Sequence, residues 1–251
     1  MRSNIVVSKK YENFRYFLEN IRDFFSKSSS TIHKARNELR VIGHDQTDVV
    51  VKAFKVPNPL NRLIYGKFRA SKARKSYENA MTLERLGITT PEAIGYVEFY
   101  NSIFFGESFF VSKKFDYDFT IREPLLDKNF PDRDNIFKAF AAFTLMLHNK
   151  GVYHKDYSPG NILIKKLEVG YEFCLVDINR MEFKQLSTET RLANFAKLWI
   201  DDEDLSFVIK EYAKLTREDE AGLISQAIRI SNNYKNSKEA RRSLKKKLFG
   251  R

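Results

Sequence analysis

The chain has 251 residues, of which 43% are hydrophobic and 14% aromatic, so it can bury a core and is not a disordered polymer. Its one cysteine, Cys174, excludes an internal disulfide framework and fits a reducing compartment. The net charge of +12 favours anionic partners, and we see neither a membrane-spanning apolar run nor a signal peptide, so we expect a cytoplasmic protein.

The first part of the chain alternates between helical and strand patterns. Residues 1–25 have a broad aromatic and aliphatic face and are expected to be helical or to mix strand and helix. Short strands are expected near 31–42 and 48–56. The second of these contains Lys52 between β-branched and apolar residues, where a lysine is often only the solvent-facing residue of an alternating strand.

A basic segment follows at residues 57–75. Six Lys or Arg residues and no acid lie between positions 62 and 75, and apolar residues are interleaved with them. This pattern is typical of a helix lying in an anionic interface. The alternative is a stripe that packs on the protein while its cations are solvated.

Residues 75–87 predict a helix that carries Glu78 and ends at Gly87. Strands are expected near 93–100 and 103–112. The segment 109–115, which includes Ser112, is either a plain edge strand or the connection to the next part of the chain.

The motif with the clearest chemistry lies after a long apolar helix predicted at 134–148. His154 stands two residues before Asp156, and Asn161 follows five residues later, after a Pro-Gly turn and directly before an apolar strand. A second strand at 171–178 then carries Asp177 near its end. This order matches the H-x-D-x-x-x-x-N catalytic loop and the metal-binding aspartate of phosphoryl-transfer enzymes.

The rest of the chain is predicted to be helical over 188–200, 201–215 and 217–234. The acids Asp201–Asp204 stand at a helix start, where they favour the macrodipole, so we interpret them as structural rather than as a metal site. The tail 234–251 has eight basic residues and one acid, and it is either a membrane-binding segment or a solvated terminus.

At this point the chain resembles the lipopolysaccharide core kinase (Kdo/heptose kinase) family, which belongs to the protein-kinase-like superfamily. The stretches that carry the resemblance are Val49–Asn58, Ser76–Ala80, Leu86–Pro91, His154–Leu163 and Asp177. The resemblance implies an α+β, bilobal protein-kinase-like fold, with a small β-rich N-lobe that carries a regulatory-type helix and a larger helical C-lobe. We place the N-lobe at 1–115, the C-lobe at 116–233 and a basic tail at 234–251.

The resemblance also implies ATP and Mg²⁺ as cofactors and a role for each motif residue. Asp156 is the implied catalytic base, and Asn161 and Asp177 are the implied metal ligands. Lys52 positions the ATP phosphates, with Glu78 as its candidate partner and Glu84 as a competing acid that would otherwise form a surface pair. Backbone groups near Ser112 are expected to contact adenine.

Several departures from the kinase pattern bear on nucleotide and substrate. No glycine-rich G-x-G-x-x-G loop occurs, and the equivalent turn is expected at 32–37, where Lys34 or Arg36 would contact phosphate. Asp177-Ile-Asn replaces Asp-Phe-Gly, Lys155 stands where protein kinases carry arginine, and Ser158 stands where serine/threonine kinases have a lysine. The segment after Asp177 is too short to bind a protein substrate along its length.

The sequence therefore predicts an ATP-dependent kinase that phosphorylates a sugar hydroxyl of a lipid A–core precursor, with Kdo as the first choice of acceptor. We expect it to be peripheral on the inner face of the bacterial inner membrane, through residues 57–75 and 234–251, and we expect no nucleic-acid partner. One alternative is a small-molecule kinase of the aminoglycoside or choline type. Another is a membrane-binding pseudokinase.

Overall fold

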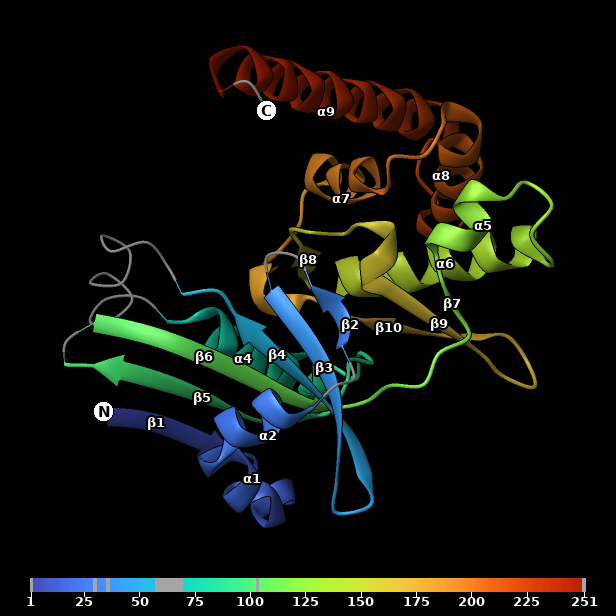
Figure 1. Cartoon of the computed structure of the whole chain (residues 1–251). Coiled ribbons are helices and arrows are strands. Elements are labelled where there is room, and N and C mark those ends of the chain that lie inside the picture. The colour runs from blue at the N-terminus through green and yellow to red at the C-terminus, as the bar shows by residue number, and fades with distance from the viewer. Residues whose placement is uncertain (1, 29–30, 35–36, 57–69, 103, 250–251) are drawn as a thin grey trace. The chain divides into compact units, whose positions relative to one another are not determined.

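The computed structural model describes residues 2–28, 31–34, 37–56, 70–102 and 104–249 (Figure 1). The fold is α+β and divides into two compact units, and the first unit includes one short segment from the later part of the chain. The first unit consists of Met1–Asp116 and Asp177–Arg180, and the second of Tyr117–Val176 and Met181–Arg251.

The first unit is built on an antiparallel six-stranded sheet with the strand order β1-β5-β6-β4-β3-β2. Its strands are β1 (Arg2–Val7), β2 (Thr31–Lys34), β3 (Asn37–His44), β4 (Thr47–Phe54), β5 (Ala93–Asn101) and β6 (Phe104–Lys113). β1 pairs with β5, so residues 1–25 do mix strand and helix.

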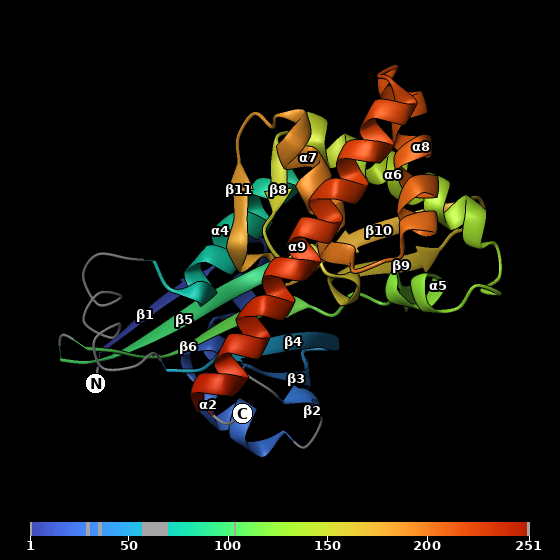
Figure 2. The same cartoon turned by 90° about the horizontal axis from the view of Figure 1, so that it is seen from above.

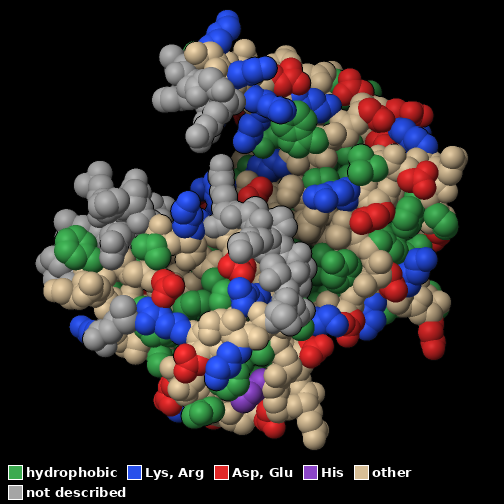
Figure 3. All heavy atoms as spheres, viewed as in Figure 1, with side chains coloured by type: hydrophobic (Ala, Val, Ile, Leu, Met, Phe, Trp, Pro, Cys, Tyr) green, Lys and Arg blue, Asp and Glu red, His purple; other side chains and the backbone are tan. Residues whose placement is uncertain are grey.

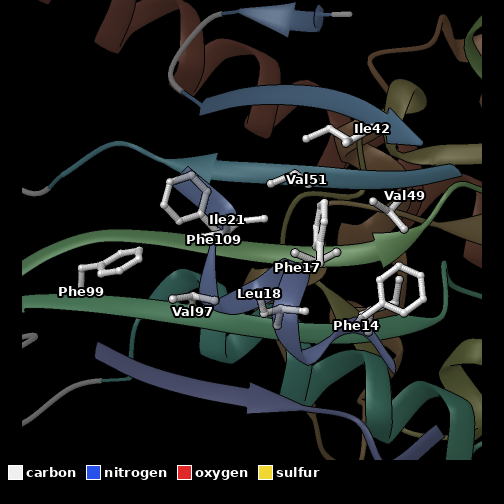
Figure 4. Packing of buried hydrophobic residues seen from close by; sticks show 12 residues of the cluster. Phe14, Phe17, Leu18, Ile21, Ile42, Val49, Val51, Val97, Phe99 and Phe109 are labelled. Carbon is white, nitrogen blue, oxygen red and sulfur yellow. The ribbon is translucent and has the colours of Figure 1, made fainter. Parts of the chain in front are cut away.

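Three short helices at the N-terminus cover one face of this sheet: η1 (Lys9–Phe14), α1 (Arg15–Glu19) and α2 (Ile21–Lys27). Figure 4 shows Phe17, Leu18 and Ile21 among the side chains that the strands contribute to the same core. Gly95 makes this packing possible, because a β-carbon there would lie 2.4 Å from Val6 O and 2.5 Å from Leu18 Cδ2.

Helix α4 (Lys72–Arg85) also belongs to the first unit, and its ends follow from the sequence. The Ser71 side chain caps its N-terminus by accepting a bond of 3.0 Å from the Arg74 amide. Gly87 ends it with φ 63°, and the bonds from the Gly87 and Ile88 amides back to Glu84 and Leu83 form a Schellman motif. The predicted stop at Gly87 is therefore observed.

The second unit is mostly helical, with two small sheets of order β10-β9-β7 and β11-β8. Its helices are α5 (Arg122–Leu126), α6 (Arg133–Asn149), η2 (Pro159–Asn161), α7 (Thr188–Phe195), η4 (Ala196–Leu198), α8 (Asp202–Thr216) and α9 (Glu220–Phe249). Its strands are β7 (Phe119–Thr120), β8 (Val152–His154), β9 (Ile162–Lys166), β10 (Tyr171–Leu175) and β11 (Met181–Phe183).

Asp201 caps α8 by accepting a bond of 2.8 Å from the Asp204 amide. The buried Asp204 carboxylate pairs with Arg133 and Lys128. These acids are structural, as the sequence indicated.

Helix α9 is one continuous helix that includes the predicted tail (Figure 2). Its first half packs on its neighbours through a stripe of buried residues spaced four apart, Leu223, Ala227 and Ser231. From residue 236 onward, every residue whose side chain the structure describes is exposed. No helix in the described ranges is both long and apolar enough to cross a bilayer.

Candidate active site

In the first unit, Lys52 and Asp177 come together across 125 positions of sequence. Lys52 lies in β4, which pairs with β3 on one side and β6 on the other. The Nζ atom of Lys52 is 2.5 Å from Asp177 Oδ1. The side chain of Lys52 is 12% exposed and that of Asp177 is 30% exposed, so water screens this ion pair only in part. Lys52 therefore points toward functional groups and is not a solvent-facing strand residue.

The backbone at Asp177 has an unusual conformation. Its φ is 54°, in the left-handed region that residues other than glycine rarely adopt, although aspartate tolerates it better than most. Asn179 donates a bond of 2.6 Å to Asp177 Oδ1, and Asn79 on α4 donates a bond of 2.6 Å to the carbonyl of Ile178. Together these bonds fix a strained turn, a feature that clusters at functional sites.

Asn179 and Asn79 are residues that the sequence analysis missed. Asn179 occupies the position of glycine in Asp-Phe-Gly, and the sequence analysis treated it only as the loss of that glycine. In the structure it is buried and holds the carboxylate of Asp177. The available signal was an amide two residues after Asp177, the predicted metal ligand.

The predicted ion pair between Lys52 and Glu78 is not formed. Glu78 accepts a bond of 2.7 Å from Arg74, one turn earlier on α4, and both side chains are about half exposed. An exposed pair at this spacing contributes about 0.3–0.5 kcal/mol. In this conformation the partner of Lys52 is Asp177.

In the second unit, the catalytic loop is organised by His154. The Asp156 amide donates a bond of 3.1 Å to His154 Nδ1, so that nitrogen is the acceptor. Nε2 therefore carries the proton and donates to the Val176 carbonyl at 3.0 Å. The neutral imidazole ties the start of the loop to the residue before Asp177.

Asn161 closes the same loop. Its Nδ2 donates a bond of 2.9 Å to the carbonyl of Asp156, and the carbonyl of Asn161 accepts a bond of 3.0 Å from the Val176 amide. Because the amide nitrogen is used within the loop, the amide oxygen is the atom that could bind a metal ion. The two predicted residues Asp156 and Asn161 are thus joined directly.

Buried polar groups support the loop from behind. Asn194 Nδ2 donates a bond of 3.0 Å to the carbonyl of His154, and Asn194 Oδ1 lies 3.2 Å from His148 Nε2. The other ring nitrogen of His148 lies 3.0 Å from the hydroxyl of Tyr212. Burial lowers the pKa of His148 to about 4, so it is neutral at pH 7.

Lys155 has a partner on the neighbouring strand. It pairs with Glu182 of β11, which also pairs with Lys184 at 2.7 Å. Hydrogen bonds from these two lysines lower the pKa of Glu182 to about 2. The lysine at this position is therefore anchored to the protein.

Ser112 lies inside β6, where it is paired with Val50 of β4 and Ala93 of β5. Its backbone belongs to a central strand of the sheet and not to a connecting segment. An adenine-binding role for the backbone near Ser112 stays a prediction. The connection between the two units follows β6, and the first unit ends at Asp116.

The model of the lipopolysaccharide kinase (Kdo/WaaP) family matches residues 57–218, which is more than half of the chain. The chain belongs to this family.

Among solved structures, the chain is similar to WaaP in complex with acyl carrier protein. The two chains are 17% identical, and the match covers 93% of this chain and 99% of that one with a TM-score of 0.59. No curated protein matches the sequence. Membership in this lipopolysaccharide kinase family implies a phosphotransferase that uses ATP. The similarity to the WaaP structure shows that the fold is kinase-like.

Lys34 and Arg36 are the two residues predicted to contact phosphate near the first hairpin of this Kdo/WaaP-family kinase. β2 and β3 pair antiparallel, so residues 32–34 and Asn37, which were expected in the turn, belong to the strands. Arg36 and the side chain of Lys34 lie outside the described residues. The same holds for residues 57–69 of the basic segment.

The described residues fit a magnesium ion of the kind that kinases use. They hold no cluster of three or more His, Cys, Asp or Glu side chains placed to bind a metal. Mg²⁺ in kinase sites is held by one or two protein oxygens together with substrate phosphates, and does not need such a cage. Asn161 and Asp177 provide side chains of the required kind.

Proposed function

We propose that this protein transfers the γ-phosphate of ATP to a sugar hydroxyl of a lipid A–core precursor, with Kdo as the first candidate acceptor. The observation that carries the proposal is the catalytic loop, in which His154 and Asn161 both hydrogen-bond to the backbone of Asp156. These bonds hold the backbone of Asp156, so its carboxylate projects from a defined position in the loop, as a general base requires.

In the proposed reaction, the Asp156 carboxylate accepts the proton of the acceptor hydroxyl. The acceptor oxygen forms a bond to the γ-phosphorus, and the bond from that phosphorus to the bridging oxygen of ADP breaks. ADP leaves with the electron pair of that bond. Asp156 is the catalytic residue of this step.

Two further groups act on the nucleotide. Lys52 contacts the α- and β-phosphates and exchanges part of its contact with Asp177 for them. Asn161 and Asp177 would each give an oxygen to Mg²⁺, which neutralises charge on the phosphates when bound. Lys34, Arg36 and Ser112 remain predicted ATP-site residues, and Glu78 would join them if nucleotide binding moves it from Arg74 to Lys52.

The test is transfer of labelled γ-phosphate from Mg·ATP to Kdo-bearing lipid A in mixed micelles, with the Asp156→Asn protein beside the natural one. Removal of a general base lowers turnover by about 10²- to 10⁴-fold. We expect that loss with unchanged ATP binding, because the substitution keeps the shape of the side chain and leaves the backbone bonds in place.

The outcomes separate the competing functions. Full turnover in Asp156→Asn would remove Asp156 from the mechanism. Transfer only to heptose-containing or soluble acceptors would replace Kdo or favour a small-molecule kinase. Failure to bind nucleotide or transfer phosphate would favour the pseudokinase.

We also propose that the C-terminal half of α9 binds the anionic cytoplasmic face of the bacterial inner membrane. Figure 3 shows Lys and Arg side chains gathered along this part of the helix. Its described cations are exposed: Lys238, Arg241, Arg242, Lys246 and Lys247. Each cation near an anionic surface contributes about 1 kcal/mol, so together they can hold a protein on a membrane.

The test is sedimentation with vesicles that contain anionic or only zwitterionic lipids. Binding should require anionic lipid, weaken with salt, and be lost when these five cations of α9 are changed to Gln. A matched control changes five exposed lysines outside both basic segments, which are Lys9, Lys27, Lys138, Lys165 and Lys210. Equal losses in both variants would mean that net charge, and not α9, is responsible.

A further inference from the structure

An arginine that the catalytic scheme does not use lies against the catalytic loop. Arg122 is the first residue of α5, directly after β7 (Figure 1). The amide of the preceding residue, Ile121, donates a bond of 3.0 Å to the carbonyl of Ile162. Ile162 follows Asn161 in the chain, so the backbone beside Arg122 is tied to the end of the loop.

The side chain of Arg122 lies over Gly160. A β-carbon on residue 160 would be 2.6 Å from Arg122 Nη2 and 3.3 Å from its Cζ. The guanidinium thus occupies the space that any larger residue at position 160 would need. Gly160 lies between the catalytic base Asp156 and the metal-binding candidate Asn161, so this cation is part of the immediate surroundings of the loop.

The charge of Arg122 is not neutralised by the protein. No ion pair to Arg122 occurs within the part of the chain that the structure describes, and its side chain is exposed. The acids near it in sequence bind other groups: Glu123 accepts bonds from the amide and hydroxyl of Thr120, and Asp118 accepts one from the Lys166 amide. Lys155 of the same loop, in contrast, is paired with Glu182.

We propose that Arg122 binds an anionic group of the acceptor, a carboxylate or a phosphate, next to the hydroxyl that is phosphorylated. A guanidinium presents parallel N–H groups that match the two oxygens of either anion. Arg122 thereby orients the acceptor over Asp156 and selects acidic sugars or phosphorylated glycolipids. This inference rests on the proposed function and adds a specificity-determining residue to it.

The experiment measures steady-state transfer while acceptor and ATP are varied separately, for the natural protein, Arg122→Gln and Arg122→Lys. Loss of a charge-assisted hydrogen bond costs about 10- to 100-fold in affinity. We expect Arg122→Gln to raise KM for the acceptor by this amount and to leave KM for ATP and acceptor-free ATP hydrolysis unchanged. Arg122→Lys should recover part of the loss, because the charge remains but the paired donors do not.

Acceptor analogues identify the group that is bound. One analogue has its sugar carboxylate converted to a methyl ester, and the other lacks the lipid A phosphates. The natural protein should discriminate against one of these analogues, and Arg122→Gln should treat that analogue and the parent acceptor alike. Which analogue behaves in this way decides between carboxylate and phosphate.

Arg229→Gln is the matched control, because it removes an exposed arginine from α9 in the same unit. The thermal unfolding midpoint of each variant reports whether it is folded. Unchanged KM for the acceptor in Arg122→Gln, or an equal loss with both analogues and the parent, would overturn the inference while the proposed function stands. Absence of transfer by the natural protein to every acceptor would overturn both.

Discussion

The catalytic loop of the second unit and the Lys52–Asp177 pair of the first unit hold functional side chains by different means. In the loop, neutral groups bond to backbone atoms, and His154, Asn161 and Asn194 provide these bonds. At Asp177, a charged side chain and a buried amide hold a strained turn. The first arrangement holds the backbone of the proposed base, while the second brings together charges that the proposed nucleotide and metal ion would rearrange.

The largest expected effect is a loss of folding stability at low pH, caused by His148, which supports the loop as a neutral imidazole. His148 has a pKa lowered to about 4 in the folded protein, against about 6.5 when exposed. The unfolded state therefore binds a proton first as pH falls, so stability is full above pH 6.5 and is lost down to about pH 4. The loss is of the order of 3 kcal/mol, measured as the free energy of unfolding by denaturant titration.

His148→Gln is the comparison for this pH dependence. It should be less stable at pH 7 but should lose less further stability between pH 6.5 and 4. An unchanged slope in His148→Gln would show that another group carries the effect.

The second effect is a fall in kcat/KM for ATP when the Lys52–Asp177 ion pair is broken. Lys52→Ala removes the phosphate contact and leaves Asp177 without its cation, so we expect kcat/KM for ATP to fall about 10- to 100-fold. Lys55→Ala, an exposed lysine just beyond the same strand, should leave kcat/KM within about twofold of the natural value. A small effect of Lys52→Ala would mean that the ion pair is structural.

Asn179 allows a finer test of the turn at Asp177. Asn179→Ala removes one bond to the carboxylate and should cost about 1 kcal/mol of stability, with a several-fold fall in kcat. Asn179→Asp should cost more, because it places a second anion beside Asp177. A larger loss in Asn179→Ala than in Asn179→Asp would contradict the bond from Asn179 to Asp177. Asn135→Ala on α6 is the control for the loss of an exposed amide.

The smallest expected effect is that of Glu78→Gln. Its partner Arg74 lies on the same exposed helix face, so kcat/KM for ATP should change by less than about twofold. A loss as large as that of Lys52→Ala would instead mean that nucleotide binding moves Glu78 to Lys52, as the sequence predicted.

Residues close together in the sequence were predicted well and distant partners poorly. His154, Asp156 and Asn161 fall within one loop, which their spacing alone identified, and the structure joins them by hydrogen bonds. The partner of Lys52 lies 125 positions away, and the phase of a helix could not reveal that Glu78 points to Arg74. The contact of Arg122 with Gly160 depends on strand pairing between β7 and β9, which no local pattern encodes.

The continuity of α9 was missed for another reason. Most residues of its second half are polar or charged, and Ala240, Leu244 and Leu248 form only a narrow apolar stripe, so the pattern by which a buried helix is recognised is weak. The sequence analysis therefore ended the helix near 234, while the structure continues it to Phe249.

The assignment of Asp177–Arg180 to the first unit has a consequence for how this protein can be divided. A fragment ending at Asp116 would contain Lys52 and Asn79 but would lack their partners, Asp177 and the carbonyl of Ile178. No single cut in the chain yields a complete first unit, so domain exchange between relatives must transplant a four-residue insert together with the N-terminal part.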